Sequence, residues 1–129
     1  MNKNTKLTLD ELIRRKVQIQ EAKKQRKTQD LYIDSLGGTI TITEPTKEIL
    51  IDVTNMDKDT YSINKYVVYN CVTEPNLKSQ ELQDTYECAE PYDIVDKLFS
   101  YGEVMQLGSY LNQLSGLTSG VEKLEEIKN

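Results

Sequence analysis

Few side chains in this sequence could carry catalytic or metal-binding chemistry. The chain contains no histidine, which removes the commonest general base, the Ser-His-Asp and Cys-His nucleophile pairs, and most zinc sites. The two cysteines, Cys71 and Cys88, are too few for a metal cluster and are expected to be reduced thiols in a cytosolic protein. We therefore expect no catalytic residue, no metal site, no cofactor and no enzymatic activity.

Two pairs of carboxylates are close enough in sequence for acid–base work or for Mg²⁺ binding; they are Asp57 with Asp59 and Asp93 with Asp96. At helix ends and on helix faces, such pairs are more often solvated charges. The first pair also matches the opening of a calcium-binding loop. That loop would need Gly at its sixth position and an acid at its twelfth, where the chain has Ser62 and Val68. We therefore interpret these carboxylates as caps and surface charges.

Tyrosine is the more informative residue type, with eight copies against one phenylalanine. Its ring is amphipathic and is enriched at protein interfaces, although tyrosines also fill the edge of a small core. This composition favours a binding module over a catalyst. The eight are Tyr32, Tyr61, Tyr66, Tyr69, Tyr86, Tyr92, Tyr101 and Tyr110.

The charge of the chain is divided unevenly along its length. Residues 1–29 hold nine basic and three acidic side chains, whereas residues 30–129 hold seven basic and eighteen acidic ones, and the net charge is −5. This asymmetry predicts a basic N-terminal helical arm (1–29), a body (30–117) and a charged C-terminal tail (118–129). A chain of 129 residues is about one domain long and can bury one modest core.

Three roles are open to the basic arm. It could bind an acidic surface on a partner or on another copy of the chain, it could bind nucleic acid, or it could be a solvated helix without a partner. Nucleic acid is disfavoured because the acidic body would repel phosphates. If the arm links copies of the chain head to tail, the residues that would carry the contact are Arg14, Arg15, Lys16, Lys23 and Lys24.

No apolar run of the sequence suggests a membrane segment. The longest clusters, such as residues 66–69, fall far short of the roughly 20 residues that a spanning helix needs. The polar residues after Met1 are also unlike a signal peptide. We therefore expect a soluble intracellular protein.

A helix is predicted to begin at Thr8. In the sequence TLDE that starts there, the Thr8 hydroxyl can accept from the Glu11 amide while the Glu11 carboxylate reaches back to the Thr8 amide, which is a capping box. The helix is expected to run to about Lys27, with an apolar stripe near helical spacing at Leu9, Leu12, Ile13 and Val17.

A β-hairpin is predicted over residues 31–43. Its second strand alternates strictly, with Ile40 and Ile42 on one side and three threonines on the other. Gly37 and Gly38 supply the positive φ angles of a tight primed turn between the strands. A phosphate-binding loop would need a helix directly after the glycines, and this chain has a β-branched strand there.

The rest of the body is predicted to be helical. Asp57 or Asp59 caps a central helix over about 59–73, and Ser100 with Glu103 forms a second capping box ahead of a final helix. Between these helices, an amphipathic face is formed by Ile94, Val95, Leu98 and Phe99. The expected fold class is α+β: a mostly helical small domain with one β-hairpin and a basic N-terminal helical arm.

Two long segments of the chain resemble the XkdN-like tail assembly chaperones of contractile-tailed phages and PBSX-like defective prophages. Residues 31–46 read LYIDSLGGTITITEPT, and residues 74–116 read EPNLKSQELQDTYECAEPYDIVDKLFSYGEVMQLGSYLNQLSG. The PNL/ELQ and EPYDIVDKLF segments carry most of the resemblance. Neither segment is a catalytic motif, so the match indicates a lineage and no reaction.

The resemblance implies a non-enzymatic assembly factor in the cytoplasm of the bacterial host. Such a chaperone would coat the tape-measure protein transiently, would be displaced as the tail tube grows, and would be absent from the mature particle. Its partners would be the tape-measure protein, other copies of itself and a frameshift-extended form of itself, with no role for a membrane. The amphipathic face predicts a partner-binding surface at Tyr92, Ile94, Val95, Leu98 and Phe99.

The alternative is a structural tail or baseplate adaptor component of a contractile phage-like particle. A tube subunit would be richer in strands that pair across chains in a continuous sheet, and this sequence has one clear hairpin.

Overall fold

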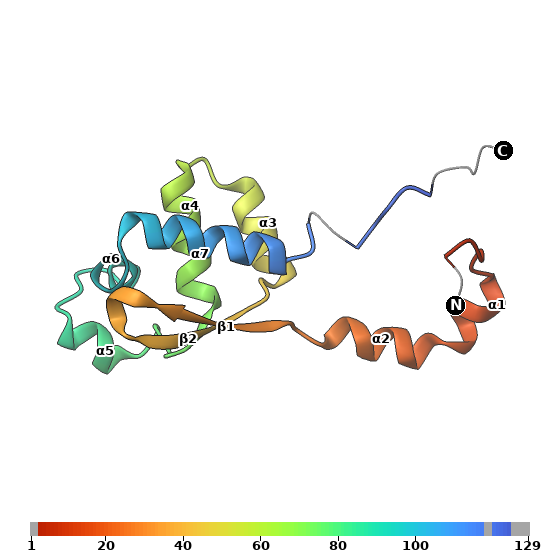
Figure 1. Cartoon of the computed structure of the whole chain (residues 1–129), viewed down its shortest axis with the longest axis horizontal. Helices are drawn as coiled ribbons and strands as arrows, with labels where there is room; N and C mark the ends of the chain where they lie inside the picture. Colours follow the sequence, from red (N-terminus) through yellow and green to blue (C-terminus); the bar gives the residue numbers. More distant parts are fainter. Residues whose placement is uncertain (1–2, 118–119, 125–129) are drawn as a thin grey trace. The chain divides into compact units, whose positions relative to one another are not determined.

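The computed structural model describes residues 3–117 and 120–124 (Figure 1). The chain divides into two units, one formed by Met1–Arg26 with Ser119–Asn129 and the other by Lys27–Thr118. The second unit, which we call the body, contains a small antiparallel sheet and five α-helices among its described residues. This is an α+β fold, as the sequence predicted.

The sheet of the body has the strand order β1-β2-β3, with β1 at Thr28–Ile33, β2 at Gly38–Thr43 and β3 at Val72–Glu74. Both pairings are antiparallel. The predicted hairpin is therefore confirmed, but its first strand starts at Thr28, within the range 1–29 expected for the arm. The third strand was not predicted because the apolar pattern of the central helix continues through Val72.

The connection between β1 and β2 differs from the predicted primed turn. A 3₁₀-helix, η1, covers Asp34–Leu36, and Gly37 follows it with φ +62°. Gly38 already belongs to β2 and pairs with Ile33. The prediction that both glycines take positive φ is wrong because a four-residue connection replaces the two-residue turn.

Five α-helices complete the body, and side-chain oxygens cap four of them. Asp59 accepts from the Ser62 amide at 2.7 Å, as one of the two predicted caps of the central helix. The second predicted capping box is confirmed, since Ser100 accepts from Glu103 and the Glu103 carboxylate accepts from the Ser100 amide at 2.8 Å. The helices are α3 (Lys47–Asn55), α4 (Thr60–Cys71), α5 (Gln80–Thr85), α6 (Asp93–Leu98) and α7 (Tyr101–Leu114).

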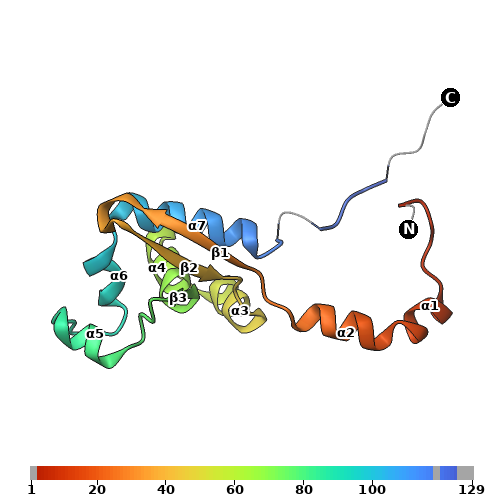
Figure 2. The ribbon, with the colours of Figure 1, turned by 60° about the horizontal axis from the view of Figure 1, so that its bottom comes forward.

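The core of the body lies between the sheet and the helices. Helices α4 and α7 pack against each other, and α7 also contacts β2 (Figure 2). As predicted, Ile40 and Ile42 turn inward together, and Cys71 is buried with them. The buried apolar cluster consists of Ile33, Ile40, Ile42, Val68, Tyr69, Cys71, Val72, Leu77, Ile94, Val95, Phe99, Val104, Leu107 and Leu111.

The basic arm contains two short helices where one was predicted. Helix α1 covers Leu9–Arg14 and α2 covers Lys16–Lys24, with a turn at Arg15 between them. Thr8 caps α1 by accepting from the Glu11 amide at 3.2 Å, and its hydroxyl also donates to the Glu11 carboxylate. Neither helix contains a buried residue. Most of the stability of a helix in a protein comes from tertiary packing. Because the apolar stripe of the arm is not buried, packing does not stabilise one long helix over these residues.

Candidate protein-binding surfaces

The predicted partner-binding face on α6 lies mostly inside the body. Ile94 and Val95 are fully buried, and Phe99 is buried with 4% of its surface exposed. Leu98 is half-buried, whereas Tyr92 remains 41% exposed. The amphipathic pattern correctly marks an apolar face, but the core of the same chain covers most of it. Of the five residues, Tyr92 offers the largest accessible surface to another protein.

Tyr92 borders a shallow hollow in the surface of the body. This hollow, which we call the tyrosine hollow, has a volume of about 360 Å³. It lies where the C-terminal end of α3, the first turns of α4 and the start of α6 meet. Its lining consists of Met56, Lys58, Ser62, Lys65, Tyr66 and Tyr92.

Ring contacts hold Tyr92 in place at the edge of the tyrosine hollow. Its ring centroid lies 4.5 Å from that of the buried Tyr69 and 6.2 Å from that of Tyr66, in tilted arrangements. The Tyr66 hydroxyl donates to Asp52 at 2.6 Å. That hydrogen bond, together with burial, raises the pKa of Tyr66 to about 12. The hollow therefore has a pre-positioned aromatic rim, a common feature of protein contact sites.

A polar cluster beside the hollow uses one of the carboxylate pairs noted in the sequence. Asp96 accepts from both the Lys65 ammonium and the Tyr61 hydroxyl, while Asp93 lies 4.0 Å from Lys65. Burial alone would raise the pKa of Asp96, but the hydrogen bonds from Lys65 and Tyr61 outweigh it and lower that pKa. Burial and the Asp96 carboxylate raise the pKa of Tyr61 to about 12. These groups connect α4 to α6, and the Tyr61 ring also stacks on Tyr101 at 5.0 Å.

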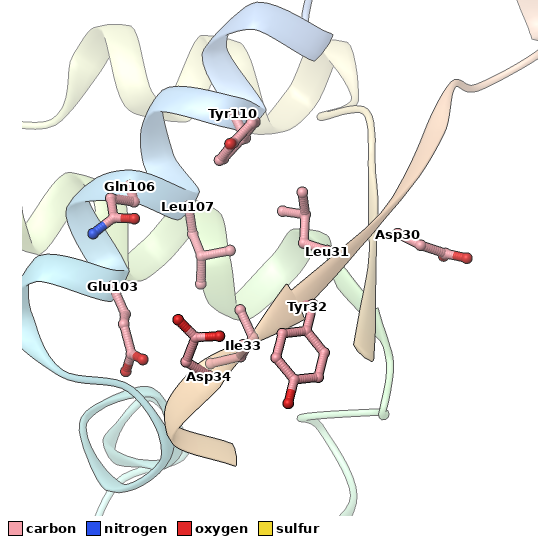
Figure 3. Close-up of a pocket in the computed structure, with 9 residues that line it drawn as sticks. All are labelled: Asp30, Leu31, Tyr32, Ile33, Asp34, Glu103, Gln106, Leu107 and Tyr110. Atoms are coloured by element: carbon pink, nitrogen blue, oxygen red, sulfur yellow. The ribbon is translucent and has the colours of Figure 1, made fainter. Parts of the chain in front are cut away.

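A second hollow, which we call the strand–helix groove, lies between β1 and α7 and has a volume of about 350 Å³ (Figure 3). Its apolar side chains come from both elements, and the carboxylates of Asp34 and Glu103 lie at one end, whereas the Asp30 carboxylate points away from α7. Hydrogen bonds from the Ser100 amide and the Ser35 hydroxyl lower the pKa of Glu103. The lining residues are Asp30, Leu31, Tyr32, Ile33, Asp34, Glu103, Gln106, Leu107 and Tyr110.

The groove follows the outer edge of the sheet. Strand β1 is an edge strand, and the Glu44 amide donates to the Lys27 carbonyl beside it at 2.8 Å. In an antiparallel pair, hydrogen-bonded residues alternate, so the backbone groups of Thr28, Asp30 and Tyr32 point toward the open edge. An open edge of this kind is a common place for another chain to attach.

The predicted self-association residues all lie on the arm. Arg14 ends α1, Arg15 lies in the turn, and the other three belong to α2, where Lys24 pairs with Glu21 at 3.6 Å. Large apolar side chains stand beside them in solvent, including Leu9 at 76% and Val17 at 71% exposure. The arm therefore presents basic and apolar groups together.

Nothing in the sequence pattern connects Met56 or Lys65 with a site, and Tyr32, Glu103 and Tyr110 of the strand–helix groove stand out only as tyrosines or as part of a capping box. The available signal was the abundance of tyrosine, since Tyr66 and Tyr92 border one hollow and Tyr32 and Tyr110 line the other. In residues 3–117 and 120–124, no three acidic or cysteine side chains gather closely enough to hold a metal ion. Within the same residues, no helix combines the length and apolar character that membrane crossing requires.

Together, the fold and these surfaces define a small α+β domain with two hollows and an exposed basic arm. The chain belongs to the phage XkdN-like tail assembly chaperone family, whose model matches residues 11–128. The match takes in most of the arm and the whole body, and it confirms the resemblance seen in the sequence. No curated protein and no solved structure matches the chain.

Proposed function

We propose that this tail assembly chaperone binds the tape-measure protein and coats it transiently during tail assembly. The family supports a role in assembling the tail. The observation that carries the finer proposal is the tyrosine hollow, a pre-positioned aromatic rim around a recess on the surface of the body. Because Ile94, Val95 and Phe99 of the expected binding face are buried, the proposed binding surface is the tyrosine hollow, which includes the exposed Tyr92.

The chemistry of the hollow suits an apolar helix. A long helical protein with an apolar stripe would aggregate unless another surface covered the stripe. A recess of about 360 Å³ can accept an apolar side chain from such a helix, while Lys58 at the same recess remains exposed. Each contact would be modest, and many copies along one helix would hold the coat by multivalency. Modest single contacts also allow displacement when the tube forms.

The test is co-expression of the chain with the tape-measure protein of the same phage or prophage. We expect the two proteins to co-purify and the tape-measure protein to become more soluble. Tyr92→Ala should lower the recovered tape-measure protein by about tenfold, as expected for loss of an aromatic anchor. Tyr86→Ala is the matched control, because Tyr86 is also 41% exposed and does not line the hollow.

Two results would contradict this proposal. An insoluble tape-measure protein with no bound chaperone would exclude the coating role. An equal loss of binding in the Tyr92 and Tyr86 variants would exclude the tyrosine hollow as the binding surface. Circular dichroism and thermal unfolding of both variants establish that each compared protein is folded.

A further inference from the structure

We infer that the strand–helix groove binds the basic arm of a second copy of the chain. This inference goes beyond the chaperone role and does not depend on which tail protein the coat covers. The groove lies on the body, and the tyrosine hollow is lined by different residues. One copy could therefore use the groove for another copy and the hollow for a tail protein.

The accessible lining of the groove is more polar than apolar, and the groove has an acidic end. Leu31, Ile33 and Leu107 line it from the two sides, and the carboxylates of Asp34 and Glu103 lie at one end (Figure 3). Glu103 is held as a carboxylate because the Ser100 amide and the Ser35 hydroxyl donate to it at 2.8 and 2.7 Å. Ile33 and Leu107 are themselves buried, so an occupant of this groove needs basic side chains for the acidic end and a few apolar ones beside them.

The arm has that composition. In α1, Leu9, Leu12 and Ile13 recur at helical spacing and are 76%, 45% and 66% exposed. Arg14 and Lys16 adjoin this stripe. Residues 1–29 carry nine basic and three acidic side chains, and residues 30–129 carry seven and eighteen, so the two parts attract each other between copies.

An arm-to-groove contact joins two different surfaces of identical chains. Such a heterologous contact leaves a free groove at one end of a pair and a free arm at the other, so association can continue into a ring or a filament. Within the body, Tyr32 and Tyr110 of the groove are 64% and 42% exposed, and within the arm α1 and α2 contain no buried residue. Charge complementarity therefore favours another copy as the occupant.

The test is sedimentation velocity of the purified full-length protein over a range of concentrations, with no tail protein present. We expect the wild type to associate and added salt to weaken the association. Reversal of the arm by Arg14→Glu, Arg15→Glu and Lys16→Glu should shift association to concentrations about tenfold higher. The groove variant Asp34→Lys with Gln106→Lys should have the same effect.

A matched control exists on α5. Asp84→Lys with Gln80→Lys changes the same two residue types by the same charge, on exposed positions that do not line the groove. This control should associate as the wild type does. If the double groove variant does not fold, Gln106→Lys alone replaces it and Gln80→Lys becomes its control, since both side chains are exposed on helices.

Mixing provides the decisive measurement. The reversed arm is acidic and the reversed groove is basic, so an equal mixture of the arm and groove variants should regain association that neither shows alone. A wild type that is monomeric at all concentrations would overturn the inference. An equal effect of the α5 control and the groove variant, or a mixture that stays dissociated, would also overturn it. None of these outcomes affects the co-purification test of the tape-measure proposal.

Discussion

Two adjacent glycines, Gly37 at the end of the β1–β2 connection and Gly38 at the start of β2, differ in backbone conformation. Gly37 has φ +62°, in the left-handed region, whereas Gly38 lies in β2 without a positive φ. A Cβ at either position would meet no atom within 4 Å, so only the backbone distinguishes them. We expect Gly37→Ala to lower the free energy of unfolding by about 1 kcal/mol.

Gly38→Ala is the control for this prediction and should leave stability within about 0.5 kcal/mol of the wild type. Denaturant unfolding measures both values. Equal losses in the two variants would mean that the connection is the primed two-residue turn expected from the sequence.

The hydroxyl of Tyr66 makes the free energy of unfolding depend on pH in the alkaline range. Its hydrogen bond to Asp52, together with burial, raises its pKa in the folded protein from 10.0 to about 12. A raised pKa contributes stability that is fully present below pH 10 and is lost as pH rises toward 12. The wild type should therefore lose stability more steeply over this interval than Tyr66→Phe does.

Denaturant unfolding at a series of alkaline pH values gives the two slopes, and phenolate absorbance follows the titration itself. Asp52→Asn removes the hydrogen-bonded carboxylate, so it should lower the pKa of Tyr66. Identical slopes for the wild type and Tyr66→Phe would show that this hydroxyl is not held as the structure describes.

At the scale of elements, the contact between α4 and α7 depends on a glycine. A Cβ added at Gly108 would lie 2.5 Å from Cγ and Oδ1 of Asn64, whose amide donates to Met105 Sδ at 3.2 Å. Asn64 would have to move and give up that contact. Overpacking typically costs about 1–3 kcal/mol, which outweighs the roughly 1 kcal/mol that alanine gains over glycine within a helix.

We therefore expect Gly108→Ala to destabilise the protein by about 1 kcal/mol in denaturant unfolding. Gly102→Ala in the same helix is its control, because the nearest atom to an added Cβ there is the Gln106 amide nitrogen at 4.0 Å. That variant should be neutral or slightly stabilising. A stabilising effect of both substitutions would mean that α4 and α7 are more widely separated than described.

Local signals predicted most elements of the body. The caps at Asp59 and Ser100 and the inward-facing pair Ile40 and Ile42 follow from interactions over a few residues, and the structure confirms them. The strand β3 was missed because Val72–Glu74 acquires strand geometry by pairing with β2, which is distant in sequence. The prediction of one long N-terminal helix was wrong, because the apolar stripe of this segment is not buried within the arm.

At the scale of the whole molecule, a transient chaperone and a permanent tail component make different predictions. If the chain coats the tape-measure protein only until the tube forms, purified mature particles should contain little or none of it relative to the tube subunit. Quantitative mass spectrometry of the particles, compared with lysate from cells producing them, measures this ratio. Abundant peptides at a fixed ratio to the tube subunit would support the structural alternative.

By itself, the sequence determined the class of fold, the charge division, the local caps and the family, because these depend on residue types, short-range spacing and motif order. Only the tertiary structure decided which surfaces remain for partners. It buried Ile94, Val95 and Phe99 in the core, left Tyr92 beside a hollow, and placed β1 against α7 to form a groove. The physical reason is that the spacing of apolar residues identifies a helix face that must be buried. Contacts between segments distant in sequence determine whether the same chain or another protein buries that face.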